Sequence, residues 1–157
     1  MRIVRLAAAA AIGLVLGGGA ANARPLPEGG VTAQEVVEAL QAKGYRAQLT
    51  KDSAGDPMIE SGLDGSTFRV LFYSCRAGGR CASIQFAWAL DMPNGMDLRK
   101  INLWNREKRF GRAYLDDEND PFLEMDVDLE RGGTTEAIGN NLDTWAAVLP
   151  AFKDFIE

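Results

Sequence analysis

Residues 57–90 constrain the fold most, because two turn signals and the apolar pattern agree on one strand register. Asp64-Gly65 is typical of a two-residue hairpin turn, and Cys75 and Cys81 bracket the next turn along the chain. If the two cysteines lie opposite each other, large apolar residues face one another across the strands, and a slip of one residue would separate them. The expected pairs are Ile59 with Val70, Phe72 with Ile84, Val70 with Phe86, and Phe68 with Trp88.

The two cysteines are most simply interpreted as a disulfide that closes this hairpin. A redox pair is the alternative, but the spacing is not C-x-x-C and no thioredoxin-like pattern surrounds it. We therefore expect a Cys75–Cys81 disulfide that holds the register. Closing so short a loop should stabilise the fold by only ~2 kcal/mol.

Three further segments carry the apolar stripe of an amphipathic helix. Thr32 and Glu35 form a capping box at the start of the first, Gly44 ends it, and Asp97 caps the second. The order α-β-β-β-α-β-β-α predicts an α+β domain, an antiparallel sheet with helices packed on one face. Outside the hairpins above, we expect helices over residues 32–44, 97–110 and 134–156 and strands over residues 45–50, 112–116 and 122–129.

The first 23 residues have the pattern of a cleaved secretory signal peptide. Arg2 and Arg5 precede an apolar run, and Ala21-Asn22-Ala23 supplies the cleavage pattern. The apolar run is shorter than the ~20 residues of a membrane-spanning helix, which disfavours a membrane anchor. We therefore expect a signal peptide over residues 1–23, a leader over 24–30 and a single domain over 31–157, in a periplasmic or secreted bacterial protein.

Composition and charge exclude several classes of function. The chain has no histidine, which removes the usual Ser-His and Cys-His nucleophile pairs and the common zinc sites. Loss of Arg2 and Arg5 with the signal peptide leaves 15 basic against 22 acidic side chains, a formal charge of −7. Such a charge argues against nucleic acid or an anionic membrane as partner. We expect no cofactor, no metal and no enzymatic activity.

An acidic segment at residues 116–121 resembles a calcium-binding loop in composition only. It fails the EF-hand pattern, because the sixth position is not glycine and the twelfth, Val127, is not glutamate. A solvated hairpin turn is the preferred interpretation.

The face of the predicted sheet that points away from the core is only half polar. Leu71 and Tyr73 should lie on it, beside Ala87 and Ala89 of the next strand. A helix that covers this patch and a protein interface are equally compatible with the sequence. Leu71 and Tyr73 are therefore candidate partner-binding residues.

Glu124, Asp126 and Asp128 alternate along one strand and are expected to form an exposed acidic row. Pairing within the molecule is the preferred interpretation, with Arg112 directly opposite Asp126 across the hairpin. A docking surface for a basic partner segment is the alternative, which makes the three acids candidate partner-binding residues. A catalytic carboxylate pair would require a cleft and a raised pKa, and a regular exposed row offers neither.

A block of polar and aromatic residues in the second half of the chain includes Asn102, Trp104, Asn105, Arg109, Arg112, Tyr114 and Asp116, which we call the motif residues. This block closely resembles the YbjN family, catalogued as bacterial sensory transduction regulators. The resemblance extends from Thr32 to the C-terminus. It implies a fold like that of the type III secretion chaperones, which bind partner proteins and commonly dimerise, with no catalytic residue or cofactor.

The leading hypothesis is a non-enzymatic periplasmic module that binds a protein, as a chaperone-like factor or a regulator in signalling or stress response; the partner is unknown, and a homodimer is compatible with it. The alternatives are a small-ligand sensor or carboxylate-dependent hydrolase, with a cleft near Trp104 and Asn105, and a secreted inhibitor of a basic enzyme.

Overall fold

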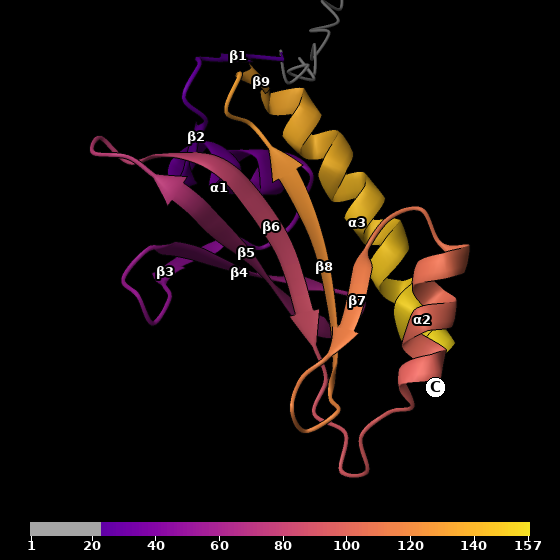
Figure 1. Cartoon of the computed structure of the whole chain (residues 1–157). Helices are drawn as coiled ribbons and strands as arrows, with labels where there is room; N and C mark the ends of the chain where they lie inside the picture. Colours follow the sequence, from indigo (N-terminus) through magenta and orange to yellow (C-terminus); the bar gives the residue numbers. More distant parts are fainter. Residues whose placement is uncertain (1–22) are drawn as a thin grey trace, which may run out of the picture.

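Alternating apolar residues build one antiparallel sheet of seven strands in the computed structural model, which describes residues 23–157 (Figure 1). The strands are β2 (Val31–Thr32), β3 (Gln48–Lys51), β4 (Pro57–Leu63), β5 (Ser66–Cys75), β6 (Arg80–Ala89), β7 (Arg112–Leu115) and β8 (Pro121–Asp128). Their order across the sheet is β3-β4-β5-β6-β8-β7, and β2 pairs with the first two residues of β6. The predicted α+β class with an antiparallel sheet is confirmed.

The register predicted for the central hairpins is confirmed. Ile59 lies opposite Val70, and Phe72 and Val70 face Ile84 and Phe86 on the next strand. The β5–β6 ladder ends at Arg69–Ala87, one pair before Phe68 and Trp88. Cys75 pairs with Cys81, and the two are joined by a disulfide. Turn chemistry and core pattern therefore define these strands together.

Three helices accompany the sheet within the described residues: α1 (Ala33–Ala42), α2 (Leu98–Glu107) and α3 (Thr135–Ile156). The capping box predicted for α1 is present, and Thr32 is its N-cap. Asp97 caps α2 through the amide of Arg99, but α2 ends at Glu107 and not near Phe110 as predicted. Lys108 has extended backbone angles, which turn the chain back so that β7 can begin at Arg112.

The core lies between one face of the sheet and helices α1 and α3 (Figure 1). Trp145 of α3 packs against Phe68 and Phe86, and its ring centroid lies 5.9 Å from that of Phe68 and 5.8 Å from that of Phe86. Helix α2 lies beside the edge strand β7, and its Trp104 meets Phe152 of α3 edge-on at 4.9 Å. The buried apolar side chains of the helices thus turn toward one face of the sheet, whereas Leu98 at the start of α2 is exposed.

The order α-β-β-β-α-β-β-α has three strands between the first two helices, but four segments are predicted as strands there, and the structure has four. The strand predicted over residues 45–50 is β3, which covers only Gln48–Lys51, while Tyr45 and Ala47 before it pack against the core. The predicted leader also contributes structure. Its β1 (Pro25–Leu26) pairs with β9 (Gly133–Thr134), and Leu26 is buried in the core.

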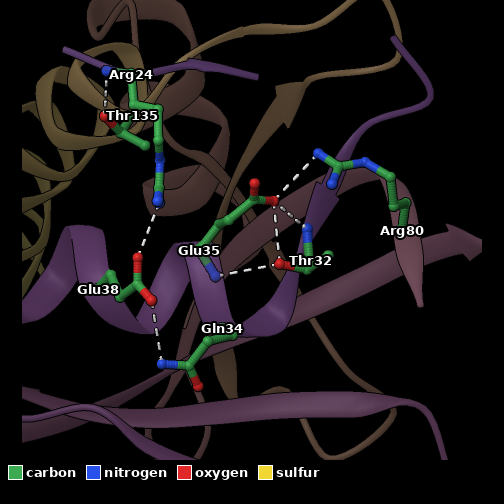
Figure 2. Close-up of polar contacts among 7 residues, drawn as sticks. All are labelled: Arg24, Thr32, Gln34, Glu35, Glu38, Arg80 and Thr135. Carbon is green, nitrogen blue, oxygen red and sulfur yellow. Dashed lines mark hydrogen bonds and ion pairs between the residues drawn. The ribbon is translucent and has the colours of Figure 1, made fainter. Parts of the chain in front are cut away.

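Polar contacts tie the beginning of the described chain to helices α1 and α3 (Figure 2). The Arg24 amide donates to Thr135 Oγ1 at 3.0 Å, and the Arg24 guanidinium lies 2.8 Å from Glu38. Glu35 accepts from the Thr32 amide at 2.8 Å and from Arg80 at 3.1 Å. Burial opposes the ionisation of Glu35, but these bonds and the charge of Arg80 outweigh it and lower its pKa. This cluster is structural, since its groups satisfy one another.

The predicted signal peptide falls on residues 1–22, which lie outside the described residues, and on Ala23. None of the helices in residues 23–157 is both long and apolar enough to cross a membrane.

Candidate functional site

The sheet has a second face on which, within residues 23–157, no helix packs; we call it the open face. Its side chains alternate along each strand with those that point into the core, so the strand period places them together. In Figure 1 strands β5, β6 and β8 run in front of α1. The open face comprises Arg69, Leu71 and Tyr73 of β5, Ser83, Gln85, Ala87 and Ala89 of β6, Phe122, Glu124, Asp126 and Asp128 of β8, and Arg112 and Tyr114 of β7.

Leu71 and Tyr73 lie where the sequence places them. Tyr73 is 43% exposed and Leu71 is half-buried. Of the two interpretations left open for this patch, cover by a helix is wrong for the described residues. The patch is therefore a free surface in the structure of this chain.

Glu124 does not belong to an exposed row, which corrects the sequence prediction. Glu124 is only 9% exposed, whereas Asp126 and Asp128 are exposed. The carboxylate accepts from the guanidinium of Arg112, from the Tyr114 hydroxyl at 2.8 Å and from Gln85 Nε2 at 3.3 Å. These donors and the cationic partner satisfy the oxygen atoms of the buried carboxylate.

Arg112 lies opposite Glu124 and not opposite Asp126 as predicted. The reason is the turn between β7 and β8: pairing continues to Leu115 and Pro121, so β8 is shifted by two residues from the expected register. This offset places Arg112 and Tyr114 where both side chains reach Glu124. The burial of Glu124 follows directly from it.

The hydrogen bonds continue from Glu124 across the sheet to β5. Gln85 also donates to Asp126 at 2.9 Å and accepts from the Tyr73 hydroxyl at 3.1 Å. Burial and the neighbouring Glu124 raise the pKa of Tyr114 to about 12. Burial and the charges of Glu124 and Asp126 likewise raise the pKa of Tyr73. Both phenols therefore keep their protons at neutral pH and act as donors.

A hollow of about 380 Å³ opens on the face beside this network. The small side chains of Ala87 and Ala89 line it. Tyr114 and Phe122 stack with ring centroids 5.1 Å apart and form one wall. The remaining lining residues are Thr67, Arg69, Leu71, Trp88 and Glu124.

The open face thus has two ends, along the direction of the strands, with different chemistry. Tyr73, Ser83, Asp126 and Asp128 form what we call the acidic margin, and the hollow lies at the other end. Together they offer hydroxyl donors, free carboxylates and apolar contact area. Glu124 lies between them, and its charge is balanced by Arg112. This arrangement suits recognition better than proton transfer, which needs a carboxylate free to exchange its proton.

The hydrolase and sensor alternatives expected a cleft near Trp104 and Asn105. A hollow of about 430 Å³ between α2 and β7 is lined by Asn105, with Ile101 and Ala113 among its neighbours, but Trp104 does not line it. Trp104 is buried, and its indole donates to the Gly111 carbonyl at 2.9 Å. The Asn105 amide both donates to the Ala113 carbonyl and accepts from the Ala113 amide, each at 2.9 Å. It thereby occupies the backbone groups of edge strand β7 in the way a further strand would.

The other motif residues have local roles or lie at the surface. Asp116 Oδ1 accepts from the amides of Glu118 and Asp120, each at 2.9 Å, which is the geometry of a hairpin turn. Within the described residues no group of three acidic or cysteine side chains is placed to hold a metal. Arg109 is exposed with its guanidinium 5.1 Å from the ring centroid of Phe110, and Asn102 is also exposed.

Arg69, Gln85 and Phe122 are the open-face residues that the sequence analysis did not select. The signal was available, since a register with Cys75 opposite Cys81 sets Gln85 opposite Leu71, and a long polar side chain is unusual at the centre of a sheet. Arg69 could have been found by its position two residues before Leu71 on the same strand.

Comparison with known proteins identifies the family. Residues 32–157 match the model of YbjN, a family described as "Putative bacterial sensory transduction regulator". No curated protein and no solved structure matches the chain. The match covers most of the chain and includes all three helices and the strands β3 to β9. On this evidence the chain belongs to the YbjN family.

Proposed function

We propose that the protein is a non-enzymatic regulator that binds a partner protein through the open face of its sheet. The observation that carries the proposal is the exposed tyrosine, Tyr73, beside Leu71 on a sheet face that no helix of the described chain covers. Tyrosine is enriched at protein interfaces because it combines a large apolar ring with a hydroxyl group. A regulator that acts through a partner agrees with the description of the family.

The acidic margin indicates the chemistry of the partner. Asp126 and Asp128 are exposed, and Asp52 contributes to the negative potential around the Tyr73 hydroxyl. A partner segment with a lysine or arginine beside an apolar side chain complements this surface: the cation meets the aspartates while the apolar group covers Leu71 and Tyr73. Charges at the rim mainly accelerate association and select the partner, and the apolar contact supplies most of the affinity.

Affinity capture from extract of the source bacterium, followed by titration of the purified partner by calorimetry, tests the proposal. The double variant Leu71→Lys/Tyr73→Glu should fold normally and lose the partner. Leu98→Lys is the matched control, because Leu98 is 65% exposed but lies on α2, away from the open face. A partner that binds the double variant as tightly as the wild type contradicts the proposal.

Two other occupants of the open face are outcomes of the same experiment. A second copy of the chain would appear as a dimer in sedimentation that the double variant abolishes. A basic enzyme inhibited by the protein would appear as a complex that weakens steeply with salt, since its affinity would rest on the acidic margin. Either result replaces the regulatory partner proposed above.

We also propose that the protein is exported to the periplasm or secreted. The signal-peptide pattern before Arg24 supports this location, as does the Cys75–Cys81 disulfide, which persists in oxidising compartments. Amino-terminal sequencing of the protein purified from its source should begin at Arg24. A chain that still begins at Met1 and carries free thiols contradicts export.

A further inference from the structure

The hollow on the open face carries an uncompensated positive charge. Two side chains of the charged residue types line it, Arg69 and Glu124. Glu124 is balanced by the guanidinium of Arg112 and also accepts from Tyr114 and Gln85. Arg69 is exposed, and its guanidinium makes no hydrogen bond or ion pair within residues 23–157. The excess charge of the hollow is therefore the single guanidinium of Arg69, on a chain whose net charge is −5.

The one carboxylate that the sheet places next to Arg69 does not neutralise it. Glu60 of β4 lies directly opposite Arg69, yet no ion pair joins them. On its other side Arg69 pairs with Ala87, a lining residue of the hollow. Arg69 is thus free to bind an anion, and a carboxylate matches the two parallel donors of a guanidinium.

The rest of the hollow suits an apolar group. Ala87 and Ala89 leave open space above β6, the stacked rings of Tyr114 and Phe122 form a flat wall, and Leu71 stands on the side of β5. The volume of about 380 Å³ lies within the range of small-molecule sites, about 300 to 1,000 Å³. The tyrosine hydroxyl of this wall is already bonded to Glu124, so the wall presents its ring and not its polar group.

We propose that this hollow binds a small monocarboxylate with a flat or branched apolar body, whose carboxylate pairs with Arg69 and whose body lies over Ala87 and Ala89. The site is distinct from the acidic margin, because neither Tyr73 nor Asp126 nor Asp128 lines it. It does not require the proposed partner protein. Leu71 lies between the two, so an occupied hollow would alter the surface that a partner meets.

Titration of 3-phenylpropanoate into the isotope-labelled protein, followed by backbone amide NMR, tests the site. The amides of Ala87, Ala89 and Phe122 should shift, with a dissociation constant of about 1 mM or lower. The neutral 3-phenylpropanamide and the cationic 3-phenylpropylamine have the same apolar body and should bind at least about tenfold more weakly, because they cannot pair with Arg69.

Two variants separate the charge from the cavity. Arg69→Gln should weaken binding of the carboxylate by about tenfold and leave the amide unaffected. Ala87→Leu should fill the hollow and weaken both probes while Arg69 remains. Arg46→Gln is the matched control, since Arg46 is exposed between α1 and β3 and does not line the hollow. Spectra of all variants report whether the fold is kept.

The inference is overturned if the amide binds as well as the carboxylate, if the shifts fall on another surface, or if no saturable shift is seen up to about 10 mM. Its failure can be distinguished from failure of the proposed function by Tyr73→Glu, which changes the acidic margin but not the lining of the hollow. If Tyr73→Glu no longer binds the partner but still responds to 3-phenylpropanoate, both proposals are supported. If the protein binds its partner but does not respond to 3-phenylpropanoate, only the ligand site is contradicted.

Discussion

The two faces of the sheet use the same strands in opposite ways. On the covered face, neighbouring strands present large apolar side chains, such as Phe72 and Phe86, to helices α1 and α3. On the open face, the intervening residues of the same strands form a network from Tyr73 through Gln85 to Glu124. Both faces contain buried groups, but they are stabilised by different interactions.

The two faces therefore differ in which substitutions they tolerate. The covered face depends on shape, because each side chain fills space that no other group can fill. The open face depends on complete hydrogen bonding, because a buried carboxylate such as Glu124 is costly once a donor is removed. Where the network ends, at the hollow and at the acidic margin, side chains remain available for ligands. The stability of this domain therefore resides mainly on one face and its recognition chemistry on the other.

The largest expected effect comes from neighbouring residues on β5 that point to opposite faces. Phe72→Ala should destabilise the fold by about 3–5 kcal/mol, since Phe72 is buried against the helices and its loss leaves a cavity. Tyr73→Ala removes an exposed ring and one hydrogen bond, and should cost about 1 kcal/mol. Chemical denaturation measures both. Equal losses would mean that the open face contributes as much to stability as the core.

The covered face could be predicted from the sequence because several local signals agree there. Asp64-Gly65, the two cysteines and the apolar alternation each define the same register, so an error in one is corrected by the others. The three helices follow in the same way from caps and apolar stripes, such as Thr32 with Glu35. Only the end of α2 differs, because it is set by the path to β7 and not by the helix itself.

The open face could be predicted only in part. Tyr73 and Leu71 follow from alternation alone, whereas the burial of Glu124 depends on a two-residue offset in the β7–β8 hairpin. Sequence has no strong signal for this offset, because the acidic turn contains no glycine and its apolar pattern tolerates either register. The hollow depends on small residues, Ala87 and Ala89, whose significance appears only once their neighbours across three strands are known.

The disulfide joins the ends of β5 and β6 and so belongs to both faces. Replacing both cysteines by serine should lower the free energy of unfolding by ~2 kcal/mol through the entropy of the unfolded chain. Binding of 3-phenylpropanoate should not change, because Cys75 and Cys81 lie at the far end of the strands from Ala87 and Ala89. Calorimetric melting and the NMR titration check the two parts. A lost ligand response in a folded variant would show that the disulfide shapes the hollow.

The side chain of Asn105 covers the edge strand β7 beside the open face, and its removal tests how that edge is stabilised. Asn105→Ala removes both bonds to Ala113 and should destabilise the fold by about 1–2 kcal/mol. The amide of Ala113 should also exchange faster with solvent. Asn102→Ala is the matched control, since Asn102 lies one turn earlier on α2 and makes no side-chain hydrogen bond within residues 23–157. Equal exchange rates in the two variants would refute the role of Asn105.

The smallest expected effect is a pH dependence confined to the open face. The pKa of Tyr114 is raised to about 12 from an ordinary value of 10.0, so the folded protein holds this proton more tightly than the unfolded chain does. The associated stability is fully present below pH 10.0 and is lost as the pH rises toward about 12. Tyr114→Phe removes the bond to Glu124 and should cost about 1 kcal/mol at neutral pH.

In alkaline solution the two proteins should therefore converge. The free energy of unfolding should fall more steeply in the wild type than in Tyr114→Phe as the pH passes from 10.0 toward about 12. Tyr45→Phe, which alters a tyrosine packed against the core, serves as the control for general alkaline effects. If the wild type and Tyr114→Phe have the same slope while Tyr45→Phe differs, the phenol of Tyr114 is not held by Glu124. The open face would then lack the complete hydrogen bonding that distinguishes it from an ordinary solvated surface.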